Sequence, residues 1–193
     1  MNMTLNESDA QLMQAVIPER SPFGRRDKAM LTFFSHTGLR VGEITGLDQG
    51  DVADFRRQAV RKQVVLPAKV CKGHRSRTVP LNRTAQAAIA QLLAFNRERG
   101  FPMGPDQPLL FSRSHQRLPI RAVQRLVQDY REKAGLVGVT PHKFRHLFGD
   151  RLVRANVNNR YIQTLLGHRQ LATVEIYTRS QPEALAAAVD LLG

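Results

Sequence analysis

The sequence is poor in several kinds of residue on which whole classes of protein depend. Its 193 residues contain one cysteine, Cys71, no tryptophan and only 6% aromatic residues. A single cysteine excludes an internal disulfide and any zinc site with several cysteine ligands, and it is typical of proteins in a reducing cytoplasm. The scarcity of aromatic side chains disfavours single-stranded nucleic acid as a partner, because proteins that bind it stack the bases on aromatic rings.

Long apolar runs and a secretory signal are also missing from the sequence. A membrane-spanning helix needs about 20 consecutive apolar residues, and no stretch of the sequence approaches this length. The first residues include Asn6, Glu7, Ser8 and Asp9, whereas a secretory signal has a basic start followed by an apolar run. We therefore expect a cytoplasmic protein with no membrane partner.

Acidic residues are the third scarce group. The chain has 16 Asp and Glu residues against 29 Lys and Arg residues, which gives a formal net charge of +13 at pH 7. A chain this basic is expected to bind a polyanion, and charge alone does not distinguish DNA from RNA or an acidic membrane. The low aromatic content favours double-stranded DNA over single strands. Hydrophobic residues make up 42% of the sequence, which is enough for a core, and the length favours a single domain over residues 1–193.

Apolar residues recur at helical spacing over most of the chain, interrupted by one stretch of strand-like alternation. Residues 52–81 alternate around a turn at Lys72, Gly73 and His74, which predicts a small antiparallel sheet. Residues 109–111 fit either a short strand or a buried turn. The predicted fold is therefore α+β and mainly helical, with a small antiparallel β-sheet. Helices are expected over 8–16, from 27 to a C-cap at Gly38, and over 40–47, 83–97, 120–134, 141–155, 160–166, 171–179 and 182–192.

Four short segments carry the residues that could perform chemistry. They are Thr37–Glu43 (TGLRVGE), Lys72–Arg75 (KGHR), His142–His146 (HKFRH) and Leu165–His168 (LLGH), and Tyr177 follows the last of them. Each segment is a weak signal by itself, because an arginine at a helix start is usually a surface charge. In their order and spacing, however, they closely resemble the catalytic domain of the tyrosine recombinases, the phage-integrase family. The resemblance covers nearly the whole chain.

The resemblance implies a set of six catalytic residues, in the order found in that family: Arg40, Lys72, His142, Arg145, His168 and Tyr177. It implies that the tyrosine attacks the DNA phosphorus, leaving a 3′-phosphotyrosyl link and a free 5′-hydroxyl, while the hairpin lysine protonates the leaving oxygen. The first histidine would assist proton transfer at the tyrosine or hold a phosphate oxygen, and the second would donate a further hydrogen bond to the phosphate. No metal ion, other cofactor or ATP is expected.

The residue types agree with this chemistry. Negative charge accumulates on the non-bridging oxygens when one oxygen of a phosphodiester is displaced, and the guanidinium groups of Arg40 and Arg145 can each donate paired hydrogen bonds to them. Glu43 lies three residues after Arg40 on the same helical face and is expected to orient it. A cationic site also supplies the positive field that a phenol needs, because an ordinary pKa of about 10 keeps tyrosine protonated at neutral pH.

Some neighbouring residues have less specific interpretations. Tyr130 and Tyr161 are the other two tyrosines, and their spacing with apolar residues favours packing roles. His146 forms an i, i+4 pair with His142, which is also typical of metal sites, but no third ligand stands at a convincing spacing. Lys69 lies near the hairpin lysine, and a phosphate contact is an alternative role for these basic residues.

Other arginines are candidates for contacts with DNA phosphates. Arg75 and Arg77 lie on the predicted hairpin and are expected to bind DNA. Arg121 and Arg125, together with Arg117, have helical spacing. Their face is expected either to bind DNA or to be a solvated surface.

The resemblance predicts a site-specific recombinase that cleaves and rejoins double-stranded DNA. Its expected partners are further copies of itself, assembled as a tetramer on DNA, and accessory proteins that bend the DNA. Two other functions stay open. One is a type IB topoisomerase-like enzyme that nicks and reseals DNA, and the other is a non-catalytic DNA-binding regulator with the same fold.

The two ends of the chain carry separate expectations. Only residues 1–20 precede the core, so the N-terminal core-binding domain that clamps DNA in most of the family is expected to be absent. This is typical of the short bacterial DNA invertases of the family, or of a fragment of a longer integrase. Residues 181–193 carry Leu185, Val189 and Leu192 at helical spacing, and we expect this apolar stripe to pack on a neighbouring protomer.

Overall fold

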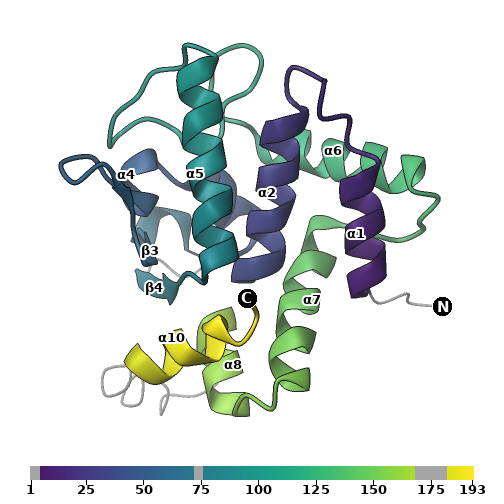
Figure 1. The fold of residues 1–193 in the computed structure, drawn as a ribbon, viewed down its shortest axis with the longest axis vertical. Coiled ribbons are helices and arrows are strands. Elements are labelled where there is room, and N and C mark those ends of the chain that lie inside the picture. Colours follow the sequence, from purple (N-terminus) through teal and green to yellow (C-terminus); the bar gives the residue numbers. More distant parts are fainter. Residues whose placement is uncertain (1–4, 72–75, 168–181) are drawn as a thin grey trace.

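The fold comes from a computed structural model, which describes residues 5–71, 76–167 and 182–193. It is mainly helical with small antiparallel sheets, which confirms the predicted fold class (Figure 1). No helix in these three ranges is both long enough and apolar enough to cross a membrane. The helices are α1 (Glu7–Ala15), α2 (Gly24–Thr37), α3 (Val41–Gly46), α4 (Gln49–Val52), the 3-10 helix η1 (Ala68–Val70), α5 (Arg83–Glu98), α6 (Ile120–Lys133), α7 (Pro141–Arg154), α8 (Asn159–Leu166) and α10 (Pro182–Asp190).

Most helix boundaries agree closely with the sequence pattern, and the differences have local causes. The cap of α1 is Asn6, not Ser8, because the Asn6 side chain accepts a hydrogen bond from the backbone N–H of Asp9 at 2.9 Å. Helix α2 begins at Gly24 rather than Asp27. Residues 109–111 form no strand, although Phe111 pairs with Arg117 in an isolated bridge, and all three side chains are buried, which agrees with the buried alternative. The helix expected over 171–179 lies outside the described residues.

Helix α2 forms the centre of the core and packs against both α5 and α7 (Figure 1). Its side chains Met30, Leu31, Phe33 and Phe34 are completely buried. The helix ends at Gly38, whose φ of 60° is the left-handed conformation typical of a C-cap. The predicted cap is thus confirmed, and it turns the chain directly into α3.

The strand region forms two separate two-stranded antiparallel sheets, β1 (Ala53–Asp54) with β2 (Ala59–Val60) and β3 (Gln63–Leu66) with β4 (Arg77–Pro80). In the second sheet Val64 lies opposite Val79 and Leu66 lies opposite Arg77. Val64, Leu66 and Val79 are buried. Alternate residues of a strand share a face, so Arg77 points to the same inward side as Val79.

The C-terminal helix α10 packs on its own chain, against α8 and β4. Leu185 and Val189 are buried in a cluster with Phe148 and Leu165 of α7 and α8. Both side chains are thus covered within the single chain described, and the expected contact of this helix with a neighbouring protomer stays a prediction. The helix is further held at its end, where the carbonyl of Gly193 accepts a hydrogen bond from Thr84.

Arg117 is not part of a helical row with Arg121 and Arg125, since α6 begins only at Ile120. Its guanidinium donates to the backbone carbonyls of Thr45 (3.1 Å) and Leu47 (2.8 Å), and it also pairs with Asp48. The side chain therefore fastens the end of α3 to the loop before α6. This inward placement corrects the expectation that Arg117 shares an exposed basic face.

Candidate active site

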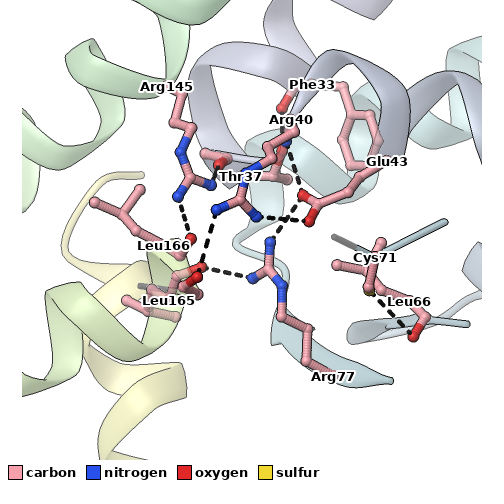
Figure 2. Close-up of polar contacts among 12 residues, drawn as sticks. Phe33, Thr37, Arg40, Glu43, Leu66, Cys71, Arg77, Arg145, Leu165 and Leu166 are labelled. Carbon is pink, nitrogen blue, oxygen red and sulfur yellow. Dashed lines mark hydrogen bonds and ion pairs between the residues drawn. The ribbon is translucent and has the colours of Figure 1, made fainter. Parts of the chain in front are cut away.

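The structure describes some of the predicted site residues and not others. Lys72, Arg75, His168 and Tyr177 lie outside the described residues. Arg40, Glu43, His142 and Arg145 lie within them, as do the predicted DNA-binding residues Arg77, Arg121 and Arg125. Arg40, Glu43, Arg77 and Arg145 come together where α2 ends, α3 begins and α8 ends (Figure 2).

Glu43 fixes both the backbone and the side chain of Arg40, which immediately precedes α3. The Arg40 backbone N–H donates to one carboxylate oxygen at 2.8 Å, and its Nη1 donates to the other at 3.0 Å. Glu43 is 1% exposed, so water competes little for its carboxylate. A second guanidinium nitrogen of Arg40 donates to the carbonyl of Gly167 at 3.4 Å. The geometry agrees with the expected orienting role of Glu43.

Arg145, on α7, is buried and bridges two other elements. Its Nη1 donates to the carbonyl of Gly38 at 2.6 Å, and its Nη2 donates to the carbonyl of Leu166. Burial and the nearby cations Arg40 and Arg77 lower the pKa of Arg145 to about 10. The guanidinium therefore stays charged at neutral pH, although it is only 4% exposed.

Gly38 allows the chain after α2 to pack closely against α7 and α8. A Cβ on this residue would lie 2.4 Å from Cδ1 of Phe148 and 3.0 Å from Cδ2 of Leu166. Its left-handed backbone conformation would also be strained in other residues. The glycine of the Thr37–Glu43 segment is thus required both for the turn and for the close packing of α7 and α8 beneath it.

Arg77 is placed differently from the exposed phosphate contact that the sequence predicted. Its Nη2 donates to Glu43 and its Nη1 to the carbonyl of Leu165, both at 2.8 Å. The side chain is only 18% exposed. Sequence reasoning missed this inward role, although one signal was present: Arg77 has the same strand parity as the apolar Val79.

Three arginines from three separate elements thus donate to three successive carbonyls at the end of α8. Arg77 binds the carbonyl of Leu165, Arg145 that of Leu166 and Arg40 that of Gly167 (Figure 2). The last carbonyls of a helix lack partners within the helix and form the negative end of its dipole, which favours cations there. The result is a concentration of fixed guanidinium groups suited to an anion such as a phosphodiester.

His142 and His146 lie on one exposed face of α7, with their ring centroids 4.6 Å apart. Partial burial, together with the neighbouring His146 and Arg145, lowers the pKa of His142. A neutral imidazole is therefore the main form at neutral pH. Among the described residues, no group of three or more His, Cys, Asp and Glu side chains is placed to hold a metal ion.

The remaining candidates separate into exposed and packed residues. Arg121 and Arg125 are exposed on α6. Tyr130 is buried and its hydroxyl donates to Asp27 at 2.7 Å, while Tyr161 is half-buried against the cluster beneath α10. Burial and the hydrogen bond to Asp27 raise the pKa of Tyr130, which makes it a poor nucleophile.

Comparisons with known proteins show what the sequence and the fold of this chain are similar to. The sequence matches the phage integrase family over residues 3–184. It is 41% identical over 172 residues to tyrosine recombinase XerC of Chromohalobacter salexigens, covering 88% of this chain and 53% of that protein. It is 32% identical over 168 residues to XerC of Herpetosiphon aurantiacus, covering 87% and 52%. The chain spans about half the length of these curated relatives.

Solved structures agree on the fold. The integrase of mycobacterium phage Brujita superposes with a TM-score of 0.73 at 23% identity, over 100% of this chain and 58% of the other. The XerA recombinase gives 0.70 at 26% identity, over 97% and 62%. The XerH site-specific recombinase gives 0.68 at 20% identity, over 99% and 53%.

Proposed function

Since the chain belongs to the phage integrase family of tyrosine recombinases, we propose that it cleaves and rejoins double-stranded DNA at specific sites through a 3′-phosphotyrosyl intermediate. The observation that carries this proposal is the convergence of Arg40 and Arg145 at the end of α8. Each uses two of its five N–H donors to bind described parts of the protein, so donors remain for the oxygens of a phosphate.

The fixed guanidinium groups act on the phosphate. Their inward hydrogen bonds hold them in place before DNA binds, so little reorganisation is needed when charge develops on the non-bridging oxygens. The guanidinium groups of Arg40 and Arg145 would each donate a pair of hydrogen bonds to one phosphate. These bonds stabilise the pentacovalent transition state more than the ground state, because the charge on the non-bridging oxygens grows during attack. A metal ion or ATP is not required for this stabilisation.

Tyr177 is the proposed nucleophile. Its oxygen forms a bond to phosphorus, the bond from phosphorus to the 5′-oxygen breaks, and Lys72 gives a proton to that oxygen. A 5′-hydroxyl from another strand reverses the step and restores the tyrosine, so the energy of the DNA bond is kept. The position of the described site supports this assignment. Arg40 binds the carbonyl of Gly167, and the predicted catalytic residue His168 is the next residue in the sequence.

His142 supplies a neutral imidazole beside the arginines. With its pKa lowered, the ring can accept the proton of the tyrosine or donate from one nitrogen to a phosphate oxygen. Its place in the first turn of α7, three residues before Arg145, puts it on the same side of the helix as that arginine.

The proposed binding partners of this chain are inferred from its net positive charge and from its structural neighbours. The structural neighbour XerH was solved with a palindromic difH substrate, and a palindromic site presents two equivalent half-sites to two copies of one protein. We infer that this chain likewise self-associates on DNA, with four copies needed to exchange strands between two duplexes. Arg75, Arg121 and Arg125 would contact phosphates, and accessory proteins would bend the DNA.

The proposal is tested by capturing protein–DNA adducts that resist SDS from bacterial cells expressing the chain, and by sequencing the attached DNA ends. We expect adducts at a small set of sequences, none from Tyr177→Phe, and undiminished adducts from the matched control Tyr161→Phe. A plasmid carrying two copies of the recovered site then distinguishes strand exchange from simple relaxation. Recombinant products support a recombinase, whereas relaxation without recombinants, or no adducts at all, would overturn the proposal.

A further inference from the structure

We propose that Arg77 is a positioning residue of the catalytic site, which links the carboxylate that orients Arg40 to the end of α8. This inference rests on the proposed function, because Arg40 matters here as a ligand of the DNA phosphate. It reassigns Arg77 from the DNA surface to the interior of the site.

The first observation is that Arg77 shares Glu43 with Arg40. One carboxylate oxygen of Glu43 accepts from the Arg40 guanidinium, and the other accepts from both the Arg40 backbone N–H and Nη2 of Arg77. A buried carboxylate needs several donors to stay in one orientation. Loss of the Arg77 bond would weaken the hold on that oxygen, and Arg40 would lose its fixed direction.

The second observation concerns the other terminal nitrogen of the Arg77 guanidinium. Its Nη1 holds the carbonyl of Leu165, and its guanidinium lies against the backbone of Gly167. A Cβ on Gly167 would be only 3.0 Å from Nε and 3.1 Å from Cζ of Arg77. The same guanidinium therefore contacts the segment that leads directly into His168 (Figure 2 shows Arg77 between Glu43 and Leu165).

The third observation is geometric. A guanidinium has a rigid planar set of donors, so its two terminal nitrogens can bind Glu43 and Leu165 at the same time. A lysine has one terminal nitrogen on a flexible chain and cannot reproduce both directions. We therefore expect Arg77→Lys to keep the charge but to lose the bridge.

The test measures single-turnover formation of the covalent adduct, with protein in excess over a short duplex carrying the site recovered by sequencing. We expect Arg77→Lys to slow adduct formation about 10- to 100-fold, as a small misplacement of catalytic groups does. Its affinity for the duplex should stay close to that of the unaltered chain. Arg57→Lys, at an exposed arginine that pairs with Asp54, is the matched control and should behave like the unaltered chain.

A second substrate separates two ways in which a hairpin residue could act. In a duplex with a 5′-bridging phosphorothiolate at the cleaved bond, the leaving thiolate needs no proton, so a defect in the general acid Lys72 is relieved. Lys72→Ala should therefore be rescued by this substrate. Arg77→Lys should not be rescued, because its defect lies in the arginines that bind the phosphate.

Gly167→Ala disturbs the same contact, because its added Cβ would press on the Arg77 guanidinium, and it also strains the left-handed backbone at this residue (φ 60°), so it should slow adduct formation as well. Thermal unfolding monitors the fold of both variants. The inference is overturned if Arg77→Lys cleaves at the normal rate, if it loses only DNA affinity, or if the phosphorothiolate restores its rate. A failure of the unaltered chain to form adducts would instead overturn the proposed function itself.

Discussion

At the scale of single residues, Arg145 carries much of the account. It binds two carbonyls of two different elements, those of Gly38 and Leu166, and its own position is fixed by burial on α7. Its type and place in the His142–His146 segment were predictable, because a paired phosphate donor has to be an arginine. Its two partners were not predictable, since they lie 107 and 21 residues away in the sequence.

We predict that Arg145→Lys lowers the rate of adduct formation by about 100-fold or more while the protein still folds. A lysine keeps a positive charge but can hold neither both carbonyls nor two phosphate oxygens. Arg154→Lys, at an exposed arginine of the same helix, is the control. Single-turnover cleavage and circular dichroism measure the two effects, and equal rates in both variants would contradict a phosphate-binding role for Arg145.

At the scale of elements, the sequence pattern located helices better than it located their partners. The periodicity of Leu185 and Val189 correctly indicates a C-terminal helix with one apolar face. A periodic pattern does not say which surface covers that face, and here it is α8 of the same chain. Arg77 shows the same limit, because its strand parity is readable while its partner Glu43 lies on a different element.

The packing of α10 leads to a stability prediction with a matched pair of variants. Val189 is 0% exposed and Leu191 is 64% exposed on the same segment of chain. We expect Val189→Ala to lower the free energy of unfolding by about 2 kcal/mol and Leu191→Ala to lower it by less than about 0.5 kcal/mol. Urea denaturation of the free protein measures both, and equal effects would mean that α10 is not packed on its own chain in solution.

A histidine between helices gives a pH dependence. His36 on α2 lies 3.1 Å from the Asn82 amide and 3.2 Å from the Arg151 guanidinium, and burial together with Arg151 lowers its pKa to about 4. The unfolded chain, with an ordinary histidine pKa of about 6.5, therefore binds one more proton between these values. Stability should fall as the pH drops through this window, by up to about 1.4 kcal/mol per pH unit from this residue.

The contribution of His36 is isolated by comparing urea unfolding at pH 4 to 7 for the unaltered chain and His36→Gln. The variant should lose less stability as the pH falls, whereas His115→Gln, at an exposed histidine, should keep the original slope. Identical slopes in all three proteins would show that His36 is not held in its neutral form.

At the scale of the whole molecule, the net charge of +13 predicts binding to DNA that weakens steeply with salt. Charge alone does not indicate which residues contact phosphates. The structure separates the candidate arginines into inward-facing and exposed ones. Arg77 and Arg117 turn inward to carboxylates and carbonyls, whereas Arg121 and Arg125 are exposed on α6. The composition thus indicates a polyanionic partner, but it does not indicate the surface that would bind it.

We predict that Arg121→Gln and Arg125→Gln each reduce the slope of log affinity against log salt concentration by about 1, as the loss of one phosphate contact does. Fluorescence anisotropy with a labelled duplex over a range of salt concentrations measures this slope. An unchanged slope in both variants would assign the α6 face to solvent instead of DNA.

The most direct test of the central claim is to identify the covalent bond itself. The adduct is trapped with SDS, digested with nuclease and protease, and analysed by mass spectrometry. The account predicts a nucleotide joined through its 3′-phosphate to the peptide that contains Tyr177, and a free 5′-hydroxyl on the other DNA end. A nucleotide on Tyr130 or Tyr161, or a 5′-phosphate link, would contradict the proposed mechanism.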